Sequence, residues 1–260
     1  MTQGNALPNV SRRLILLLAA VLFPDLSHGA TTHPAAGLEP YAVRMLRGPG
    51  INGTFHDSGA GIYLGNGLIL TAAHVAGKPT AESSLLAGFP FGNVLAVFVK
   101  AGEFDDVDAT LVSVDATEFP VDMQGLKPLT LCADAPVPGQ AVIVVAPGSI
   151  SESHIISNDV LNGLLAPEVA EKLSTLIADV YTTGNSGTGV FDKATHCLMG
   201  IMSRKIERVR TSYAELIPKK SVAPVAKYFV SANLIRSFFG PLLREPTPLR
   251  LRAQSRDDMR

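Results

Sequence analysis

The sequence predicts an all-β protein built in two halves, and three observations support this. Short apolar runs of strand length recur between turns rich in glycine, proline and acidic residues. Helical periodicity is convincing in only two segments, residues 167–177 and 231–239. A cluster of breakers at Pro120, Gly125 and Pro128 interrupts the pattern near its middle. We therefore expect one half at about 41–117 and the other at about 126–230.

The expected strands follow from runs rich in Val, Ile, Leu and Phe, each bounded by turn residues. Between the first two runs stands Gly65-Asn66-Gly67, which is typical of a tight β-hairpin turn. The second helical segment places Leu234, Ile235 and Phe238 on one face, as a short C-terminal helix would. The runs lie at residues 61–64, 68–71, 94–99, 111–114, 141–146 and 198–202.

Residues 1–30 have the pattern of a cleavable signal peptide. Two arginines at positions 12 and 13 precede ten apolar residues, 14–23, and small residues follow up to Ala30. Ten residues of helix span only about 15 Å, roughly half of a bilayer core. We therefore expect cleavage after Gly29 or Ala30, a secreted or periplasmic protein, and no stable membrane anchor. A buried N-terminal helix is the alternative.

Composition limits the class of partner. The formal net charge is −1 and hydrophobic residues make up 47% of the chain, which favours a globular domain, here 31–240, over a nucleic-acid-binding protein. Past Gly240 the composition changes to three prolines and five arginines without an apolar period. We expect a disordered tail at 241–260. No oligomeric state is indicated.

The chain contains 2 cysteines, Cys132 and Cys197. In an exported protein they could form a disulfide closing a 65-residue loop, worth about 4 kcal/mol in the chain-entropy model. Two buried thiols are the alternative. Two cysteines are too few for a zinc site, and the acidic run 105–108 lacks the glycine and distant glutamate of a calcium loop. We expect no metal and no cofactor.

Candidate catalytic residues occur in the order His74, Asp108, Ser186. The serine lies among glycines in Gly184-Asn185-Ser186-Gly187, and the histidine ends an apolar run. A serine hydroxyl needs a base to become nucleophilic, and that base needs a carboxylate to orient it. Histidine, aspartate, serine is one of three known chain orders for such a triad. An α/β-hydrolase acting on esters requires a different order and a Gly-x-Ser-x-Gly elbow, so it is disfavoured.

The transition state also needs donors for its oxyanion. A glycine can turn its backbone N–H inward, and one such donor stabilises the transition state by about 3 to 4 kcal/mol. We therefore assign an oxyanion hole to the N–H groups of Gly184 and Ser186.

At these residues the chain resembles the chymotrypsin-like serine peptidases. Thr71-Ala72-Ala73-His74 is similar to their histidine motif, and 184–187 to their serine motif. The segment 108–115 resembles the acidic strand of the bacterial high-temperature-requirement (HtrA) branch, and 198–203 the strand that lines the substrate cleft. The resemblance implies two six-stranded antiparallel β-barrels with the cleft between them, His74 and Asp108 in the first and Ser186 in the second.

The same resemblance implies substrate contacts. Val180 would form the base of the primary specificity pocket, although a shift of one residue would put Asp179 there. Ser203 would open the backbone segment that pairs with substrate. We expect the basic residues 205, 208 and 210 on a solvated loop, with a role in holding an acidic substrate as the alternative.

The sequence thus predicts an exported serine endopeptidase acting on protein or peptide substrates. One departure keeps a second hypothesis open, because Thr188-Gly189 stands where the family has Gly-Pro. A catalytically silent scaffold that acts as a protein-binding module is that alternative.

Overall fold

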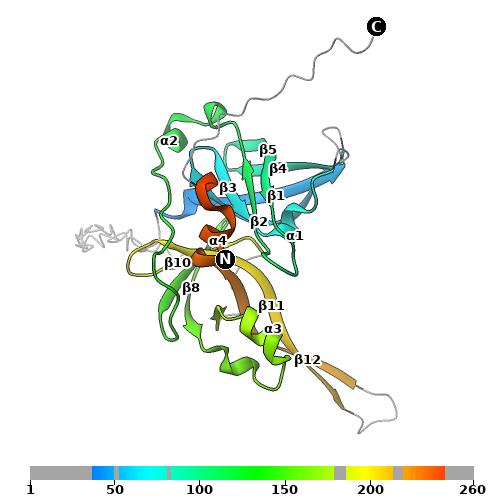
Figure 1. Cartoon of the computed structure of the whole chain (residues 1–260). Coiled ribbons are helices and arrows are strands. Elements are labelled where there is room, and N and C mark those ends of the chain that lie inside the picture. The colour runs from blue at the N-terminus through cyan, green and yellow to red at the C-terminus, as the bar shows by residue number, and fades with distance from the viewer. Residues whose placement is uncertain (1–36, 50–52, 81–82, 179–185, 213–218, 244–260) are drawn as a thin grey trace, which may run out of the picture. The chain divides into compact units, whose positions relative to one another are not determined.

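The computed structural model describes residues 37–49, 53–80, 83–178, 186–212 and 219–243 (Figure 1). Four expectations fall outside these ranges. They are the signal peptide, the pocket residue Val180, the oxyanion donor Gly184 and most of the tail.

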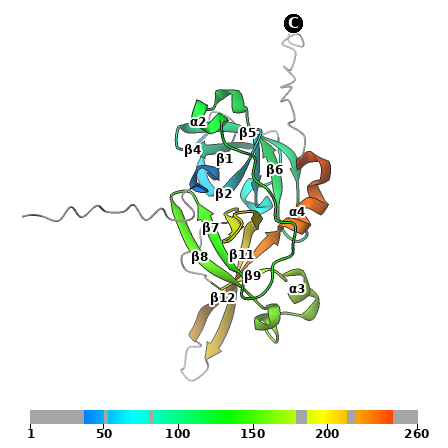
Figure 2. The ribbon, with the colours of Figure 1, turned by 90° about the vertical axis from the view of Figure 1, so that its left-hand side faces the viewer.

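Twelve strands close into two antiparallel β-barrels, which confirms the expected fold (Figures 1 and 2). The order in the first barrel is β1-β2-β3-β6-β5-β4, and in the second β10-β11-β12-β9-β8-β7. The first barrel consists of β1 (Ala42–Pro49), β2 (His56–Gly65), β3 (Leu68–Thr71), β4 (Ser83–Phe89), β5 (Gly92–Ala101) and β6 (Thr110–Ser113). The second consists of β7 (Ala141–Ala146), β8 (Ser149–Ile156), β9 (Leu176–Ile177), β10 (Gly189–Asp192), β11 (Leu198–Ser212) and β12 (Lys219–Ser231).

Each barrel is filled by the apolar residues of the predicted runs. Ile69 and Leu111 are fully buried in the first barrel, and Ile143 and Leu198 in the second. The predicted hairpin turn joins β2 to β3, with Asn66 and Gly67 at φ of 53° and 75°. These left-handed angles are what an Asn-Gly pair tolerates, so the turn is confirmed.

The described helices are short, with at most eight residues each. The predicted C-terminal helix is confirmed as α4, and the Ser231 hydroxyl caps it by accepting the Leu234 N–H. The helix expected over 167–177 is wrong in its second half. There α3 ends at Lys172, and β9 pairs with β8 and β12 instead. The helical segments are η1 (Glu39–Tyr41), α1 (Ala73–Ala76), η2 (Ala116–Glu118), α2 (Val121–Gln124), η3 (Asn158–Leu161), α3 (Pro167–Lys172), α4 (Ala232–Phe239) and η4 (Gly240–Leu243).

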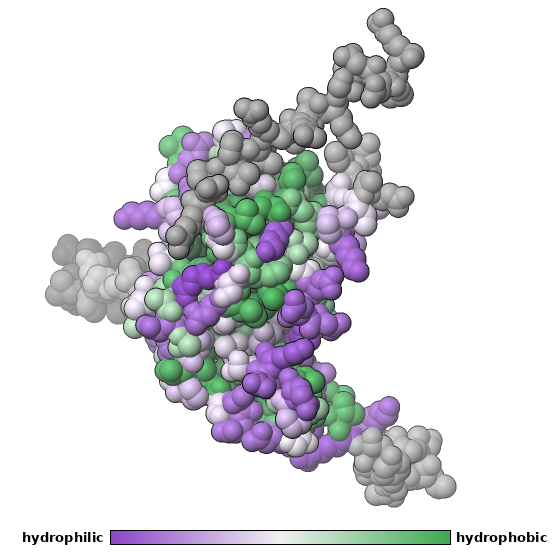
Figure 3. Space-filling view, in the orientation of Figure 1, coloured by the Kyte–Doolittle hydropathy of each residue, from purple (hydrophilic) through white to green (hydrophobic). Residues whose placement is uncertain are grey.

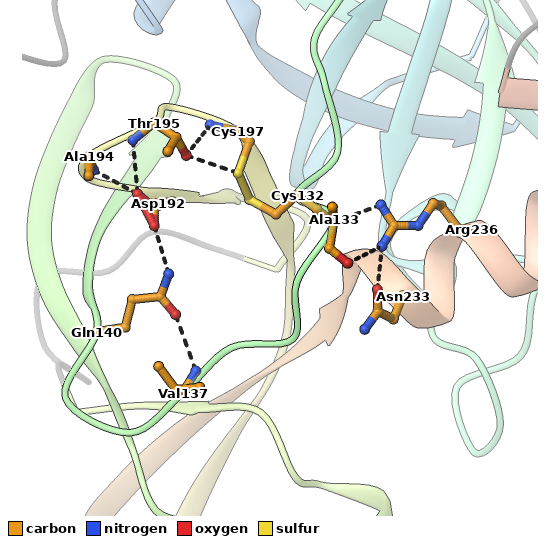
Figure 4. The surroundings of a disulfide bond; sticks show 10 residues. All are labelled: Cys132, Ala133, Val137, Gln140, Asp192, Ala194, Thr195, Cys197, Asn233 and Arg236. Atoms are coloured by element: carbon orange, nitrogen blue, oxygen red, sulfur yellow. Dashed lines mark hydrogen bonds between the residues drawn. A yellow bond between two sulfur atoms is a disulfide. The ribbon is translucent and has the colours of Figure 1, made fainter.

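The predicted disulfide between Cys132 and Cys197 is confirmed, with Cα atoms 5.0 Å apart. It joins residues 114–140, the connector between the two barrels, to the turn before β11 (Figure 4). Arg236 of α4 donates to the carbonyl oxygens of Cys132 and Ala133, at 2.7 and 3.0 Å. The connector, the second barrel and the C-terminal helix are therefore held together at one point.

Helix α4 is also attached to the first barrel. Lys100 of β5 lies over the Phe238 ring, 4.0 Å from its centroid, and donates to the Phe238 carbonyl. The connector also contacts η1, directly before β1, because the Tyr41 hydroxyl donates to the Lys127 carbonyl at 2.8 Å.

Strands β11 and β12 are the two longest, at 15 and 13 residues. They stay paired from Gly200 opposite Ser231 to Ser212 opposite Lys219, and form a two-stranded arm that leaves the second barrel (Figures 1 and 2). The basic residues 205, 208 and 210 lie in β11, so the expectation of a loop there is wrong. Backbone pairing with β12 decides their conformation.

No helix among the described residues is long and apolar enough to cross a membrane.

Candidate active site

His74 is held by a single helical turn directly after β3. The strand ends at Thr71, whose buried hydroxyl donates to the Ala60 carbonyl of β2 at 2.6 Å. Helix α1 follows and stops at Gly77, whose φ of 74° suits a residue without Cβ. The His74 side chain, 33% exposed, therefore projects from a fixed backbone and reaches solvent.

Asp108 lies two residues before β6, and its side chain is 1% exposed. Its carboxylate accepts the His74 backbone N–H at 3.0 Å, and its Oδ2 lies 2.8 Å from His74 Nδ1. One carboxylate thus caps α1 and orients the imidazole on it. This contact fixes Nδ1 as the protonated nitrogen of the neutral ring and leaves Nε2 free to accept a proton.

The pKa of Asp108 lies below its ordinary value. Burial alone would raise this pKa, because it disfavours the charged form. Hydrogen bonds from His74 and Ser203 stabilise the carboxylate and outweigh burial. Asp108 is therefore an anion at neutral pH, and it can stabilise a proton on the adjacent ring.

Ser203 donates to the same carboxylate. Its side chain is 1% exposed, and its Oγ lies 2.5 Å from Asp108 Oδ2. Ser203 occupies a β-bulge in β11, since Met202 pairs with Phe229 and Arg204 with Tyr228. The extra residue is turned out of the ladder, as bulges re-aim side chains. Sequence reasoning assigned Ser203 only a backbone role, because a bulge leaves no readable pattern in a single sequence.

Ser186 lies in a turn packed between the two barrels. The Ala60 N–H of β2 donates to its carbonyl at 2.8 Å, and the next N–H, of Gly187, donates to Met202 at 2.7 Å. Gly187 has a φ of 88°, and a Cβ there would lie 1.8 Å from the Ala60 carbonyl oxygen. Only glycine fits this position, so the residue after Ser186 lets the turn rest against β2.

The departure from the family pattern, Thr188-Gly189, is built into the core. Thr188 is fully buried, and its carbonyl accepts the Met202 N–H at 2.8 Å. A Cβ at Gly189 would lie 2.7 Å from the Ile62 side chain. The pair is therefore accommodated by close packing, and the turn keeps its contacts with both barrels.

The Ser186 hydroxyl donates to the Ser203 carbonyl at 2.8 Å. Among the described residues no hydrogen bond joins it to the His74 ring. The structure nevertheless brings the three candidate residues to one place, because Ser203 contacts Ser186 through its carbonyl and Asp108 through its hydroxyl.

Phe104 and Arg204 form one wall beside the imidazole, and sequence reasoning missed both. The Phe104 ring, in a side chain 42% exposed, meets the His74 ring edge-on with centroids 5.3 Å apart. The Arg204 guanidinium lies 3.8 Å from the Phe104 centroid and donates to the Phe104 carbonyl. This cation–π contact fixes the wall at the start of the arm.

The remaining expectations concern metal binding, the specificity pocket and the oxyanion hole. Within the described ranges no group of three or more His, Cys, Asp or Glu side chains could hold a metal ion. Val180 and Gly184 lie outside those ranges.

Comparison with known proteins gives a family and a fold. Kallikrein-related peptidase 10 superposes with a TM-score of 0.53 at 18% identity, over 79% of this chain and 97% of that one. The structure of GrC superposes with a TM-score of 0.51 at 15% identity, over 80% of this chain and 96% of that one. The comparison with curated proteins yields no match. Residues 59–201, which contain His74, Asp108 and Ser186, match a family described as the trypsin-like peptidase domain. The chain therefore belongs to the trypsin-like peptidase family.

Proposed function

We propose that the protein is an exported serine endopeptidase that cleaves peptide bonds with Ser186, His74 and Asp108. The observation that carries this proposal is the contact between His74 Nδ1 and the buried Asp108 carboxylate, 2.8 Å long. A histidine oriented in this way presents Nε2 as a base. Ser186, in the turn before β10 of the second barrel, is the candidate nucleophile.

In the proposed mechanism the Ser186 oxygen forms a bond to the substrate carbonyl carbon while His74 Nε2 takes its proton. The anion of Asp108 stabilises the charged ring that results. His74 then gives the proton to the leaving amine, the C–N bond breaks, and an acyl-enzyme remains. His74 then takes a proton from a water molecule whose oxygen bonds to the acyl carbon, the bond to Ser186 Oγ breaks, and His74 returns the proton to that oxygen. The N–H groups of Gly184 and Ser186 would donate to the oxyanion in both steps.

Before attack, the Ser186 hydroxyl has to rotate from the Ser203 carbonyl towards His74. A substrate backbone N–H would then take the place of the hydroxyl as the donor to that carbonyl. Binding of the substrate main chain and activation of the nucleophile would in this way be coupled through one oxygen atom.

The finer assignments rest on the sequence. The signal-like segment 1–30 and the confirmed disulfide support export to an oxidising compartment. The segment beginning Asp108-Ala109-Thr110 supports a place in the HtrA-like branch. Val180 at the base of the primary pocket would favour an apolar side chain over a charged one.

Labelling with a fluorophosphonate probe tests the proposal. The purified chain should be labelled, Ser186→Ala should not, and Ser221→Ala, which removes an exposed serine of β12, should be labelled like the parent. Cleavage of casein by the parent would establish turnover. Equal labelling of the parent and Ser186→Ala would contradict the assignment.

One observation favours the second candidate, a silent scaffold that binds proteins. The Ser186 hydroxyl is hydrogen-bonded to Ser203 instead of to His74. A protein of this kind would bind peptides but would neither react with the probe nor cleave casein.

A further inference from the structure

We infer that the distal arm, residues 207–210 of β11 and 219–224 of β12, docks on the surface of a bilayer that contains anionic lipid. The inference goes beyond the proposed function, because it concerns where the protein binds and not which bond it cleaves.

The distal arm is a two-stranded ribbon without lateral support from the other described strands. Strand β10 pairs with β11 only at residues 198–201, and β9 pairs with β12 only at Lys227 and Tyr228. The ribbon projects away from both barrels (Figures 1 and 2). A two-stranded ribbon is only marginally stable in water by itself, so a surface that covers it would stabilise it.

Cations gather on the distal arm, although the whole chain has a net charge of −1. Four of them lie there, at Arg208, Arg210, Lys219 and Lys220. The one carboxylate of the distal arm, that of Glu207, is already paired with Lys205 at 2.5 Å. No ion pair among the described residues involves Arg208, Arg210 or Lys220. Such an excess of positive charge on a weakly negative chain favours contact with an anionic surface.

Two valines lie among these cations. Val209 and Val222 are directly opposite each other across the ribbon, and they are 59% and 55% exposed. Lys220, two residues from Val222, shares their face, and Arg210 adjoins Val209 on the other face. In the space-filling view hydrophilic surface and a smaller hydrophobic patch lie side by side on the arm (Figure 3). An end-on approach would therefore bring both the valines and the cations of the two faces to one surface.

The combination of cations with exposed aliphatic side chains favours a lipid surface over other occupants. Anionic headgroups attract Lys and Arg, and the acyl boundary beneath them accepts apolar side chains. A hydrated polyanion offers the first interaction without the second. A second copy of the arm would bring like charges together. The occupant that fits both kinds of side chain is a bilayer with anionic headgroups.

Docking would hold the candidate active site near the membrane. Ser203 and Arg210 belong to the same strand, and the segment between them extends about 24 Å. A polypeptide anchored in the same bilayer would therefore meet the site at a high effective concentration. This consequence rests on the proposed function, whereas docking itself does not.

Co-sedimentation with lipid vesicles tests the docking. The chain 31–260, expected after signal cleavage, is used so that the apolar segment 14–23 does not contribute. Vesicles with about 30% phosphatidylglycerol in phosphatidylcholine should bind it at least about tenfold more tightly than pure phosphatidylcholine. In 1 M salt, where the Debye length is about 3 Å, most of this difference should disappear. Equal affinity for the two kinds of vesicle at low salt would overturn the inference.

Charge removal localises the binding. Arg210→Gln together with Lys220→Gln should weaken it about 25-fold, because each cation near an anionic surface contributes about fivefold. Both side chains are exposed, so the barrels should fold as in the parent. Lys78→Gln with Lys127→Gln is the matched control, because it removes the same charge from exposed residues outside β11 and β12. An equal loss in the control would show that net charge alone attracts the protein, which would contradict docking by the arm.

A fluorescent reporter tests whether the distal arm reaches lipid. The chain contains no tryptophan, so Val222→Trp places a single indole on the ribbon. Brominated phosphatidylcholine in the anionic vesicles should quench its emission. Val137→Trp, at an exposed position of the connector, is the control and should stay unquenched. Equal quenching of both reporters, or of neither, would sink the assignment.

The two valines distinguish lipid from a soluble polyanion. Val209→Thr with Val222→Thr keeps the shape of both side chains and should weaken vesicle binding about fivefold. Binding to heparin, a polyanion without an apolar phase, should not change. Equal vesicle affinity with and without the valines would assign the arm to polyanions instead.

Cleavage separates this inference from the proposed function. The parent should cleave a lipid-anchored casein peptide on anionic vesicles faster than the variant with Arg210→Gln and Lys220→Gln, and both should cleave the free peptide equally. Vesicle binding by a chain that fails to react with the fluorophosphonate probe would refute the proposed function and leave the docking established.

Discussion

Replacing Ser203 by alanine should destabilise the protein by removing one donor from a buried anion. The Ser203 hydroxyl lies 2.5 Å from Asp108 Oδ2, and each side chain is 1% exposed, so water cannot replace the lost donor readily. Hydrogen bonds to charged groups contribute about 1.5 to 3 kcal/mol. For a domain of this size that loss should lower the melting temperature by about 3 to 12 °C.

The loss should depend on pH. Hydrogen bonds hold the folded-state pKa of Asp108 below its unfolded value, so the carboxylate contributes stability above the unfolded pKa and loses it as pH falls through the folded pKa. Ser203→Ala moves the folded pKa of Asp108 upward. The difference in free energy of unfolding between the parent and the variant should therefore be full at neutral pH and shrink in acid, where the carboxyl is protonated in both.

Urea denaturation at pH 7 and near pH 3 measures this difference. Ser113→Ala is the matched control, because Ser113 is also a buried serine but donates to a neutral acceptor, the Val97 carbonyl, at 3.5 Å. The control should lose less stability, and its loss should not change with pH. If Ser203→Ala were no more destabilising than Ser113→Ala, or if its effect were the same at both pH values, the account of Asp108 would be refuted.

Three further predictions address the reaction, the turn and the disulfide. Asp108→Asn should preserve the fold but lower kcat by about 10⁴-fold, because an amide favours the wrong histidine tautomer; casein turnover and circular dichroism check this, and a loss below tenfold would contradict the triad. Gly187→Ala should lower the free energy of unfolding by several kcal/mol and abolish probe labelling, since its Cβ would lie 1.8 Å from a backbone carbonyl of β2. The control Gly148→Ala, at a similar φ but with no atom near its Cβ, should lower the free energy of unfolding by about 1 kcal/mol. Equal losses for the two variants in denaturation experiments would show that the turn at Gly187 moves freely. Serine at both Cys132 and Cys197 should lower the free energy of unfolding by about 4 kcal/mol, and a parent insensitive to reductant would contradict this.

Strands with continuous apolar runs were predictable, because burial of both faces leaves an unbroken signal. Strands β3, β6 and β7 are of this kind, and the structure has them within a residue of the predicted ranges. Strand β8 was missed because its exposed side places Ser, Glu and His between isoleucines. Strand β9 was mistaken for helix, since two residues carry no period and only their pairing with β8 and β12 makes them a strand.

The candidate site was predictable where chemistry requires particular residue types close in sequence. The histidine turn and the glycines around Ser186 are such cases. Asp108 was harder to choose, because Asp105 and Asp106 precede it and only the fold decides which carboxylate meets the imidazole. The Ser203 hydroxyl and the Phe104–Arg204 wall depend on a bulge and on a contact spanning 100 residues. Neither leaves a local signal.

The attachments of α4 bear on how this polypeptide can be divided. Helix α4, which follows the last described strand, carries Phe238 onto Lys100 of β5 and Arg236 onto the carbonyl of Cys132. A fragment that contains only the first barrel would therefore lack the α4 residues that pack against it, and a fragment that contains only the second barrel would lack the residues that α4 contacts. A split reporter cut in the connector should reassemble only when the downstream fragment retains residues 232–239, and fusion partners belong beyond residue 243.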